Sequence, residues 1–120
     1  MKKVKFLNLE ETDKDLIISF AIEDEMSGVK SLILHRTLFF EEFLSEEERG
    51  VVVSMEDFNV EDEHLNMLKE IRIKADQIEI LAAFGEYRID ITNIERSEIE
   101  KMILLLEKQN YDDRFSIQVA

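Results

Sequence analysis

The chain has 120 residues, of which 45% are hydrophobic and 36% are charged, and it contains no cysteine. This length and apolar fraction predict a single α+β domain, residues 1–120, that is large enough for one hydrophobic core. The lack of cysteine excludes disulfides, thiolate metal sites and cysteine nucleophiles.

Two features of the sequence bear on its compartment. No apolar run approaches the roughly 18 residues that a membrane-spanning helix needs. Residues 1–6 are basic but lack the long apolar stretch of a secretory signal. We therefore expect a cytoplasmic protein that does not bind membranes.

Acidic residues dominate the charge, with 28 against 15 basic residues and a formal net charge of −13. This balance repels phosphate backbones, so we expect no direct nucleic-acid binding. Much of the excess lies in residues 41–63, where Arg49 is the only basic residue. The acidic residues of this window are Glu41, Glu42, Glu46, Glu47, Glu48, Glu56, Asp57, Glu61, Asp62 and Glu63. They predict either a solvated surface or a docking surface for a basic protein.

The N-terminal half alternates apolar and polar residues as β-strands do. Residues 4–9 place apolar side chains first at even and then at odd positions, which predicts a β-bulge or a strand covered on both faces. Residues 16–22 and 29–37 form the next two expected strands, joined by a turn in which Gly28 can adopt a positive φ. The β-branched run at residues 51–55 predicts another short strand.

Residues 39–49 combine aromatic and acidic side chains in a pattern typical of a short acidic helix or turn. Its apolar side consists of Phe39, Phe40, Phe43 and Leu44. Ser45 and Glu48 also match a capping box, so a helical turn could begin at Ser45 instead. The phenylalanines either close the open end of a small core or line an apolar binding site.

Alternating runs return in the C-terminal half, at residues 71–75, 78–80 and 87–91, and again at residues 115–119. Short polar or glycine-containing breaks separate the first three runs, as expected of hairpins. If the last run lies at an edge of the sheet, it can pair with a second copy of the chain and form a homodimer.

Residues 97–109 have the period of a helix, with an apolar stripe on one side. Ser97 begins a second capping-box match, and Asn110 can end the helix in the left-handed conformation. A helix of this length needs a sheet to pack on. The chain therefore predicts an α+β fold. It consists of a mostly antiparallel sheet of about seven or eight strands, curved or split, with this one main helix packed across it.

No motif indicates catalysis or a cofactor. The sequence has neither a nucleophile elbow nor a glycine-rich phosphate loop. His35 and His64 are the only histidines, too few for a typical zinc site. The acidic stretch 57–64 lacks the glycine and the closing glutamate of an EF-hand loop. We expect no catalytic residue, metal or cofactor, and the sequence does not indicate an enzyme.

Two functions remain open. The one we favour is a non-catalytic protein–protein interaction or regulatory module that presents the acidic surface at residues 41–63 to a basic partner. The candidate partner-binding residues are Glu41, Glu42, Glu46, Glu47, Glu48, Glu61, Asp62 and Glu63.

The alternative is a small-molecule-binding protein or small enzyme with a pocket between the sheet and segment 39–44. The candidate pocket residues are His35, Arg36, Phe39, Phe40 and Phe43. His35 and Arg36 are consecutive on an expected strand, so their side chains point to opposite faces and cannot form one catalytic cluster.

Overall fold

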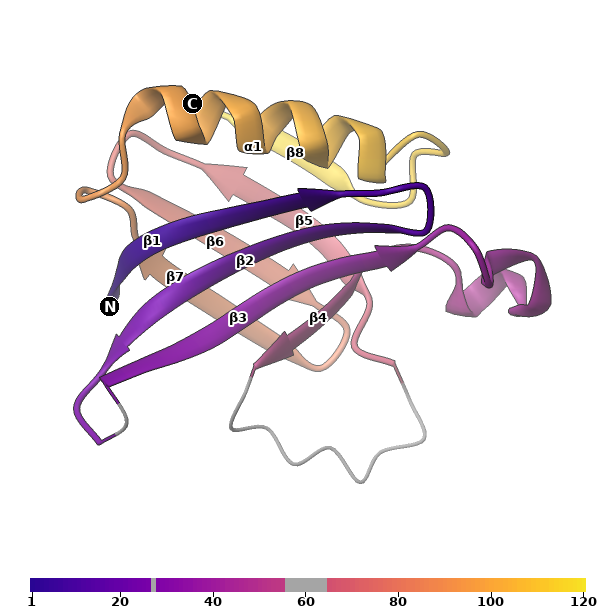
Figure 1. The fold of residues 1–120 in the computed structure, drawn as a ribbon, viewed down its shortest axis with the longest axis horizontal. Coiled ribbons are helices and arrows are strands. Elements are labelled where there is room, and N and C mark those ends of the chain that lie inside the picture. Colours follow the sequence, from indigo (N-terminus) through magenta and orange to yellow (C-terminus); the bar gives the residue numbers. More distant parts are fainter. Residues whose placement is uncertain (27, 56–64) are drawn as a thin grey trace.

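The computed structural model describes residues 1–26, 28–55 and 65–120. Across these residues the backbone forms a mixed eight-stranded sheet with one main helix near the C-terminus (Figure 1), which confirms the expected sheet-rich α+β class. The strands are β1 (Lys2–Glu11), β2 (Asp15–Asp24), β3 (Gly28–Thr37), β4 (Val52–Met55), β5 (Leu68–Ile73), β6 (Gln77–Ala82), β7 (Gly85–Asp90) and β8 (Ser116–Val119). The helical elements are α1 (Arg96–Gln109) and the 3₁₀ turns η1 (Glu41–Phe43) and η2 (Glu46–Glu48).

The strand order in the sheet is β4-β3-β2-β1-β7-β6-β5-β8. Strands β1 to β4 form one antiparallel meander and β5 to β7 form another. The pairings of β1 with β7 and of β5 with β8 are parallel, so the sheet is mixed rather than only antiparallel. The second of these follows from α1, because a helical crossover returns the chain beside β5 in the same direction.

The sheet folds over into two layers, and β1, β2 and β3 cross in front of β5, β6 and β7 in Figure 1. At one corner β1 pairs with β7 only through Lys2 and Lys3. At the opposite corner the N–H of Val53 donates to the carbonyl of Asn66 at 2.8 Å, and the N–H of Leu68 donates to the carbonyl of Val51 at 2.8 Å. The two layers therefore enclose one space between them.

Apolar side chains from both layers and from α1 fill this space as one cluster. Its buried members are Val4, Leu16, Ile18, Phe20, Ile22, Leu32, Leu34, Val51, Val53, Leu68, Ile71, Ile73, Ile78, Ile80, Ile89, Ile91, Met102, Leu105, Leu106 and Phe115. Every second residue of β2, from Leu16 to Ile22, belongs to the cluster, as a strand with one buried face requires.

A β-bulge explains the change of parity in β1. The register between β1 and β2 shifts between Val4 and Phe6, which confirms the bulge expected from the sequence. Val4 is completely buried, whereas Phe6 after the bulge is 57% exposed. Gly28 has a φ of +82° at the start of β3, as expected for the turn that precedes it.

Helix α1 agrees with the expected range of residues 97–109 to within one residue, but both of its ends are formed differently from the expectation. Its N-cap is Glu95 and no side chain caps it, so the capping box at Ser97 is wrong. The first turn forms earlier because Glu98 and Ile99 both donate their N–H groups to the carbonyl of Glu95.

Among the described residues, no helix is long and apolar enough to cross a membrane.

At the C-terminal end, Asn110 has a φ of −105°, so the expected left-handed conformation is also wrong. Its side chain ends the helix instead. The amide oxygen accepts hydrogen bonds from the N–H groups of Arg114 and Phe115, and the amide nitrogen donates to the carbonyl of Phe115. Asp113, in the turn that follows α1, has a positive φ of 56°.

Substitutions at two leucines of α1 test how the helix packs on the sheet. We expect Leu106→Ala to lower the free energy of unfolding by about 2–5 kcal/mol, because Leu106 is completely buried and its truncation leaves a cavity. Leu104→Ala, on the same helix at a 60% exposed position, should stay within about 0.5 kcal/mol of wild type. Urea unfolding of both variants measures the difference, and equal losses would contradict this packing.

Candidate functional site

Beyond the end of β3 the chain forms the segment that contains η1 and η2, which extends to one side of the molecule in Figure 1. We call residues 39–48 the acidic–aromatic loop. The sequence predicts a short acidic helix or turn here, and the structure has two single 3₁₀ turns. Ser45 is the N-cap of η2, but its side chain makes no capping hydrogen bond.

The loop is anchored by Arg36, a charged residue inside the protein. Leu32, Leu34 and Arg36 lie at alternate positions of β3 and all three are completely buried. Arg36 therefore lies on the core face, at the end of the strand where the apolar cluster stops. A buried guanidinium is stable only if its donors are satisfied, because an unpaired buried charge is very unfavourable.

Every donor of the Arg36 guanidinium has an acceptor. Nε donates to Glu41 Oε2 at 3.0 Å, and Nη2 donates to Glu41 Oε1. Nη1 and Nη2 donate to the two carboxylate oxygens of Asp112 at 2.8 and 3.0 Å. The second Nη1 donor reaches the carbonyl of Gln109 at 2.7 Å. The ring of Tyr111 stacks 4.3 Å from Cζ of Arg36, and its hydroxyl lies 3.1 Å from Nη2.

These contacts shift the pKa values of Arg36 and Asp112. Burial alone disfavours the charged form of Arg36, but its hydrogen bonds to the carboxylates of Glu41 and Asp112 outweigh burial and raise the pKa of Arg36 above its ordinary value. The hydrogen bond from Arg36, assisted by one from Arg114, lowers the pKa of Asp112 well below its ordinary value of 3.8 despite partial burial. Arg36 and Asp112 are therefore both charged at neutral pH.

Arg114 makes a second connection between the same two segments. Its Nη1 donates to the carbonyl of Glu46 at 2.7 Å and to that of Arg49 at 3.3 Å, and its Nε donates to Asp112. Arg49, which directly follows the loop, donates through its Nε to the carbonyl of Leu44 at 3.2 Å. Both ends of the acidic–aromatic loop are therefore bound to the chain between α1 and β8.

Gln109 joins the helix end to the first layer. This residue is completely buried, and its Nε2 donates to the carbonyls of Leu16 and Leu34 at 3.0 and 3.2 Å. Its own carbonyl accepts the hydrogen bond from Arg36. The last turn of α1 therefore holds both β2 and the Arg36 cluster in place.

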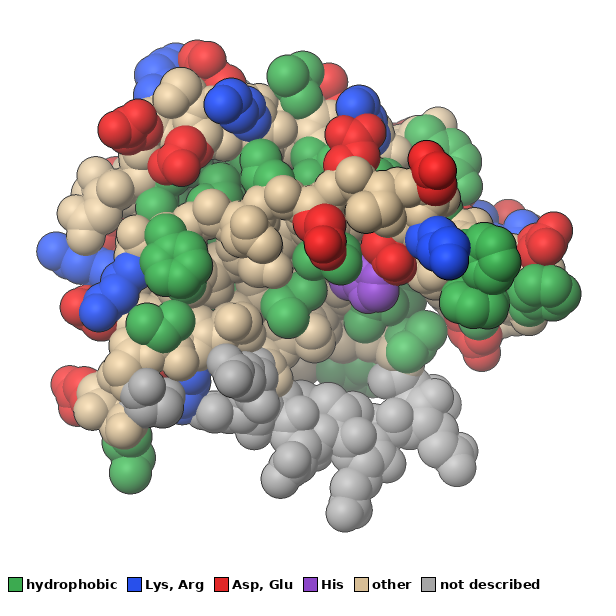
Figure 2. Space-filling model, viewed as in Figure 1, with side chains coloured by type: hydrophobic (Ala, Val, Ile, Leu, Met, Phe, Trp, Pro, Cys, Tyr) green, Lys and Arg blue, Asp and Glu red, His purple; other side chains and the backbone are tan. Residues whose placement is uncertain are grey.

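With its ends fixed, the loop directs its three phenylalanines into solvent. Phe39, Phe40 and Phe43 are 54%, 58% and 76% exposed. The rings of Phe39 and Phe40 meet edge to face with centroids 4.8 Å apart, and Nζ of Lys14 lies 5.3 Å from the Phe39 centroid. Figure 2 shows hydrophobic side chains protruding at this end of the molecule, beside charged ones. These phenylalanines do not close the core.

The candidate carboxylates divide into two groups. Glu42, Glu46, Glu47 and Glu48 are exposed on the same loop as the phenylalanines. Glu41 is only 8% exposed and holds Arg36, so it faces inward. The remaining candidates, Glu61, Asp62 and Glu63, lie outside the described residues, as does His64.

The two basic candidates for a pocket, His35 and Arg36, lie on opposite faces of β3, as strand alternation predicts. The ring of His35 is partly exposed, and its Nε2 lies 2.7 Å from Oδ1 of Asp15 on the neighbouring strand. Arg36 has no donor left for a ligand.

Within the described parts of the chain, no group of three or more His, Cys, Asp or Glu side chains is arranged to hold a metal ion.

Comparison of the chain with protein-family models, with curated proteins and with solved structures finds no match in any of the three.

Two features of the sequence point to the anchor. Arg36 continues the inward parity of Leu32 and Leu34, where an apolar residue is expected. Gln109 follows Met102, Leu105 and Leu106 at helical spacing, so it lies on the buried face of α1. A polar residue at a core position needs a partner. The identity of the partners, Asp112 above all, depends on tertiary structure.

The anchor predicts a strong response to loss of the arginine. We expect Arg36→Met to lower the free energy of unfolding by about 3–5 kcal/mol, because it leaves the buried Glu41 carboxylate without its partner. The double variant Arg36→Met/Glu41→Leu should regain at least half of that loss, since no buried charge remains. Chemical denaturation of both variants provides the measurement, and an Arg36→Met protein as stable as wild type would contradict the assignment.

The low pKa of Asp112 predicts how the anchor responds to acid. A carboxylate whose pKa is lower in the folded state stabilises the protein above its unfolded-state value, and this stabilisation is lost as the pH falls toward the folded-state value. The stability difference between wild type and Asp112→Asn should therefore be constant near neutral pH and narrow below about 3.8. Denaturant titrations between pH 7 and pH 3 test this, and a difference independent of pH would disagree with it.

Proposed function

We propose that this chain is a non-catalytic interaction module and that the acidic–aromatic loop is its partner-binding surface. The observation that carries the proposal is the exposure of Phe39, Phe40 and Phe43 on a loop fixed at both ends by Arg36 and Arg114. Side chains of this kind usually contribute to stability by burial, roughly 1.5–3 kcal/mol each. Here the network holds a geometry in which they remain in solvent.

The composition of the loop is that of a protein interface. Interfaces concentrate their binding energy in a few aromatic or arginine residues and surround them with a polar rim. Phe40 and Phe43 supply the aromatic centre, and Glu42, Glu46, Glu47 and Glu48 supply an acidic rim. The matching partner has an apolar pocket bordered by lysine or arginine.

The anchoring of the loop supports tight binding by such a small surface. A loop that is ordered before it binds loses little conformational entropy on association. The hydrogen bonds of Arg114 to the carbonyls of Glu46 and Arg49 restrict the backbone that carries the acidic rim. The net charge of −13 adds long-range attraction for a basic partner, mainly through the association rate and therefore dependent on salt.

The proposal is tested with the full chain as bait and two loop variants beside it. A partner captured by wild type is purified and its affinity is measured by calorimetry. We expect Phe40→Ser/Phe43→Ser to weaken binding at least about 30-fold, which equals about 2 kcal/mol, because a hot spot is removed. Glu46→Gln/Glu47→Gln/Glu48→Gln should slow association and reduce the salt dependence.

The matched control is Phe84→Ser, which removes a 56% exposed phenylalanine from the turn between β6 and β7. It should leave binding unchanged. All variants should unfold within about 0.5 kcal/mol of wild type, since they replace exposed side chains. A partner that tolerates both loop variants but not Phe84→Ser would place the binding surface elsewhere.

A further inference from the structure

The two outer edges of the sheet differ. Strand β4, at one end of the strand order, donates the N–H of Val53 to the carbonyl of Asn66, and Val51 just before it accepts from the N–H of Leu68. Strand β8, at the other end, pairs with β5 alone within the described part of the chain. One edge is thus covered and the other is open.

The open edge presents backbone groups that can pair. Ala120 donates its N–H to the carbonyl of Ile73 at 2.9 Å, so the backbone groups of Ala120 face β5. Alternate residues of a strand direct their N–H and C=O groups to opposite edges. Ile117 and Val119 therefore direct theirs outward. None of the residues from Ser116 to Val119 is charged or proline, the residues that usually protect an edge, in a chain that is 36% charged.

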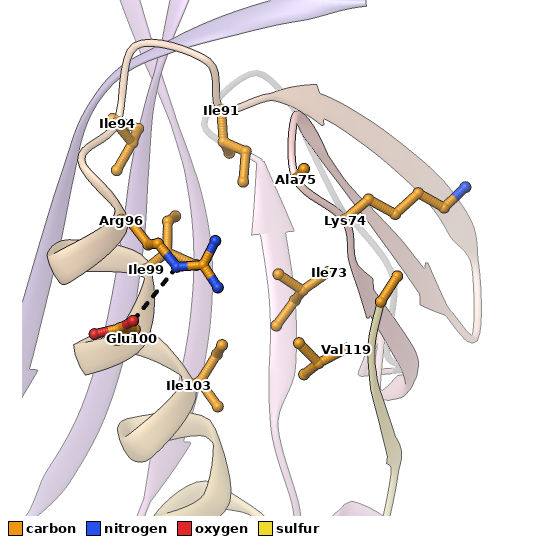
Figure 3. Close-up of a pocket in the computed structure, with 11 residues that line it drawn as sticks. Ile73, Lys74, Ala75, Ile91, Ile94, Arg96, Ile99, Glu100, Ile103 and Val119 are labelled. Atoms are coloured by element: carbon orange, nitrogen blue, oxygen red, sulfur yellow. Dashed lines mark ion pairs between the residues drawn. The ribbon is translucent and has the colours of Figure 1, made fainter.

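An apolar cleft lies beside this edge, between β8, the end of β5 and the first half of α1 (Figure 3). Ile103 of α1 and Val119 of β8 face each other across the cleft, with Ile73 between them, and Arg96 pairs with Glu100 near its mouth. Its volume is about 160 Å³. Pockets for drug-sized ligands have about 300–1,000 Å³, so this cleft has room for one large apolar side chain.

We propose that β8 is a second binding site, which takes an extended segment of a partner protein as an added strand. The added strand pairs with the outward N–H and C=O groups of Ile117 and Val119, and one of its apolar side chains enters the cleft. This mode combines backbone hydrogen bonds for affinity with a pocket for specificity. The site is separate from the acidic–aromatic loop, and neither proposal depends on the other.

Charge and size identify the occupant. Alternate residues of the added strand face the opposite side of the sheet, where the Glu70 carboxylate already accepts a hydrogen bond from Gln118 at 2.7 Å and pairs with Arg72 at 2.9 Å. The preference for basic residues in the added strand therefore comes from the net charge of −13. A second copy of the chain carries the same charge of −13 and is repelled. Two four-residue strands also pair over only about 13 Å. A contact between two such short strands buries much less surface than the roughly 800 Å² per subunit that a stable dimer buries.

The probe is an acetylated and amidated eight-residue peptide of alternating leucine and lysine. Its control has the same composition in the repeating order Leu-Leu-Lys-Lys, which retains the charge but not the strand period. We expect the alternating peptide to bind wild type at least tenfold more tightly by fluorescence anisotropy. Its binding should slow the hydrogen exchange of the Ile117 and Val119 amides at least tenfold, measured by NMR on the unmodified protein.

The variant Val119→Pro removes one outward donor and leaves the hydrogen bond of Ala120 to β5 in place. It should weaken peptide binding at least tenfold, whereas Val119→Thr, which retains the N–H and the branched shape, should stay within about threefold of wild type. Equal affinity for both peptides, or unchanged exchange at Ile117 and Val119, would overturn the proposal. So would sedimentation of wild type as a dimer that Val119→Pro dissociates, because a second copy would then occupy the edge.

Discussion

A buried arginine imposes the arrangement of this end of the molecule. The guanidinium of Arg36 lies where the apolar cluster ends, and it cannot remain there without acceptors for all its donors. Two segments supply them. Glu41 comes from the loop that follows β3, and Asp112, with the carbonyl of Gln109, comes from the chain that follows α1. The desolvation of one charge thus joins segments that are more than 70 residues apart in sequence.

This junction explains why three phenylalanines remain in solvent. A loop held only by apolar contacts turns its aromatic side chains inward. In this protein the inward position is taken by Arg36 and its partners, and Arg114 holds the following backbone through the carbonyls of Glu46 and Arg49. The loop therefore keeps its shape through ionic contacts. Its phenylalanines and its exposed carboxylates remain accessible to a partner, which is the basis of the proposed function.

Local patterns predict the elements of this fold and miss its long-range contacts. The eight strands and the main helix follow from alternation and helical period, and the bulge in β1 follows from the parity change after Val4. The cap at Ser97 was wrong, because the chain before α1 already forms a helical turn that starts at Glu95. The parallel pairing of β1 with β7 carries no local signature, since it depends on how the two meanders meet in space.

The acidic residues between 41 and 63 show the same limit of prediction from sequence, because their tertiary partners are not visible in it. Composition treats its carboxylates as equivalent, yet the structure buries Glu41 against Arg36 and leaves Glu46, Glu47 and Glu48 in solvent. Only the parity of Arg36 on β3 signals that a nearby carboxylate must turn inward. A charged residue at a core position is therefore the most informative single feature of this sequence, because its partners decide which acidic residues remain available for binding.

The most direct test of this account is NMR of the arginine side chains at neutral pH. With all its donors bound and no exposure to solvent, Arg36 should show a slowly exchanging Nε proton and separate Nη resonances that report hindered rotation of the guanidinium. The exposed Arg96 should show neither feature. An Arg36 signal that exchanges with water as fast as that of Arg96 would contradict the buried anchor and, with it, the fixed acidic–aromatic loop.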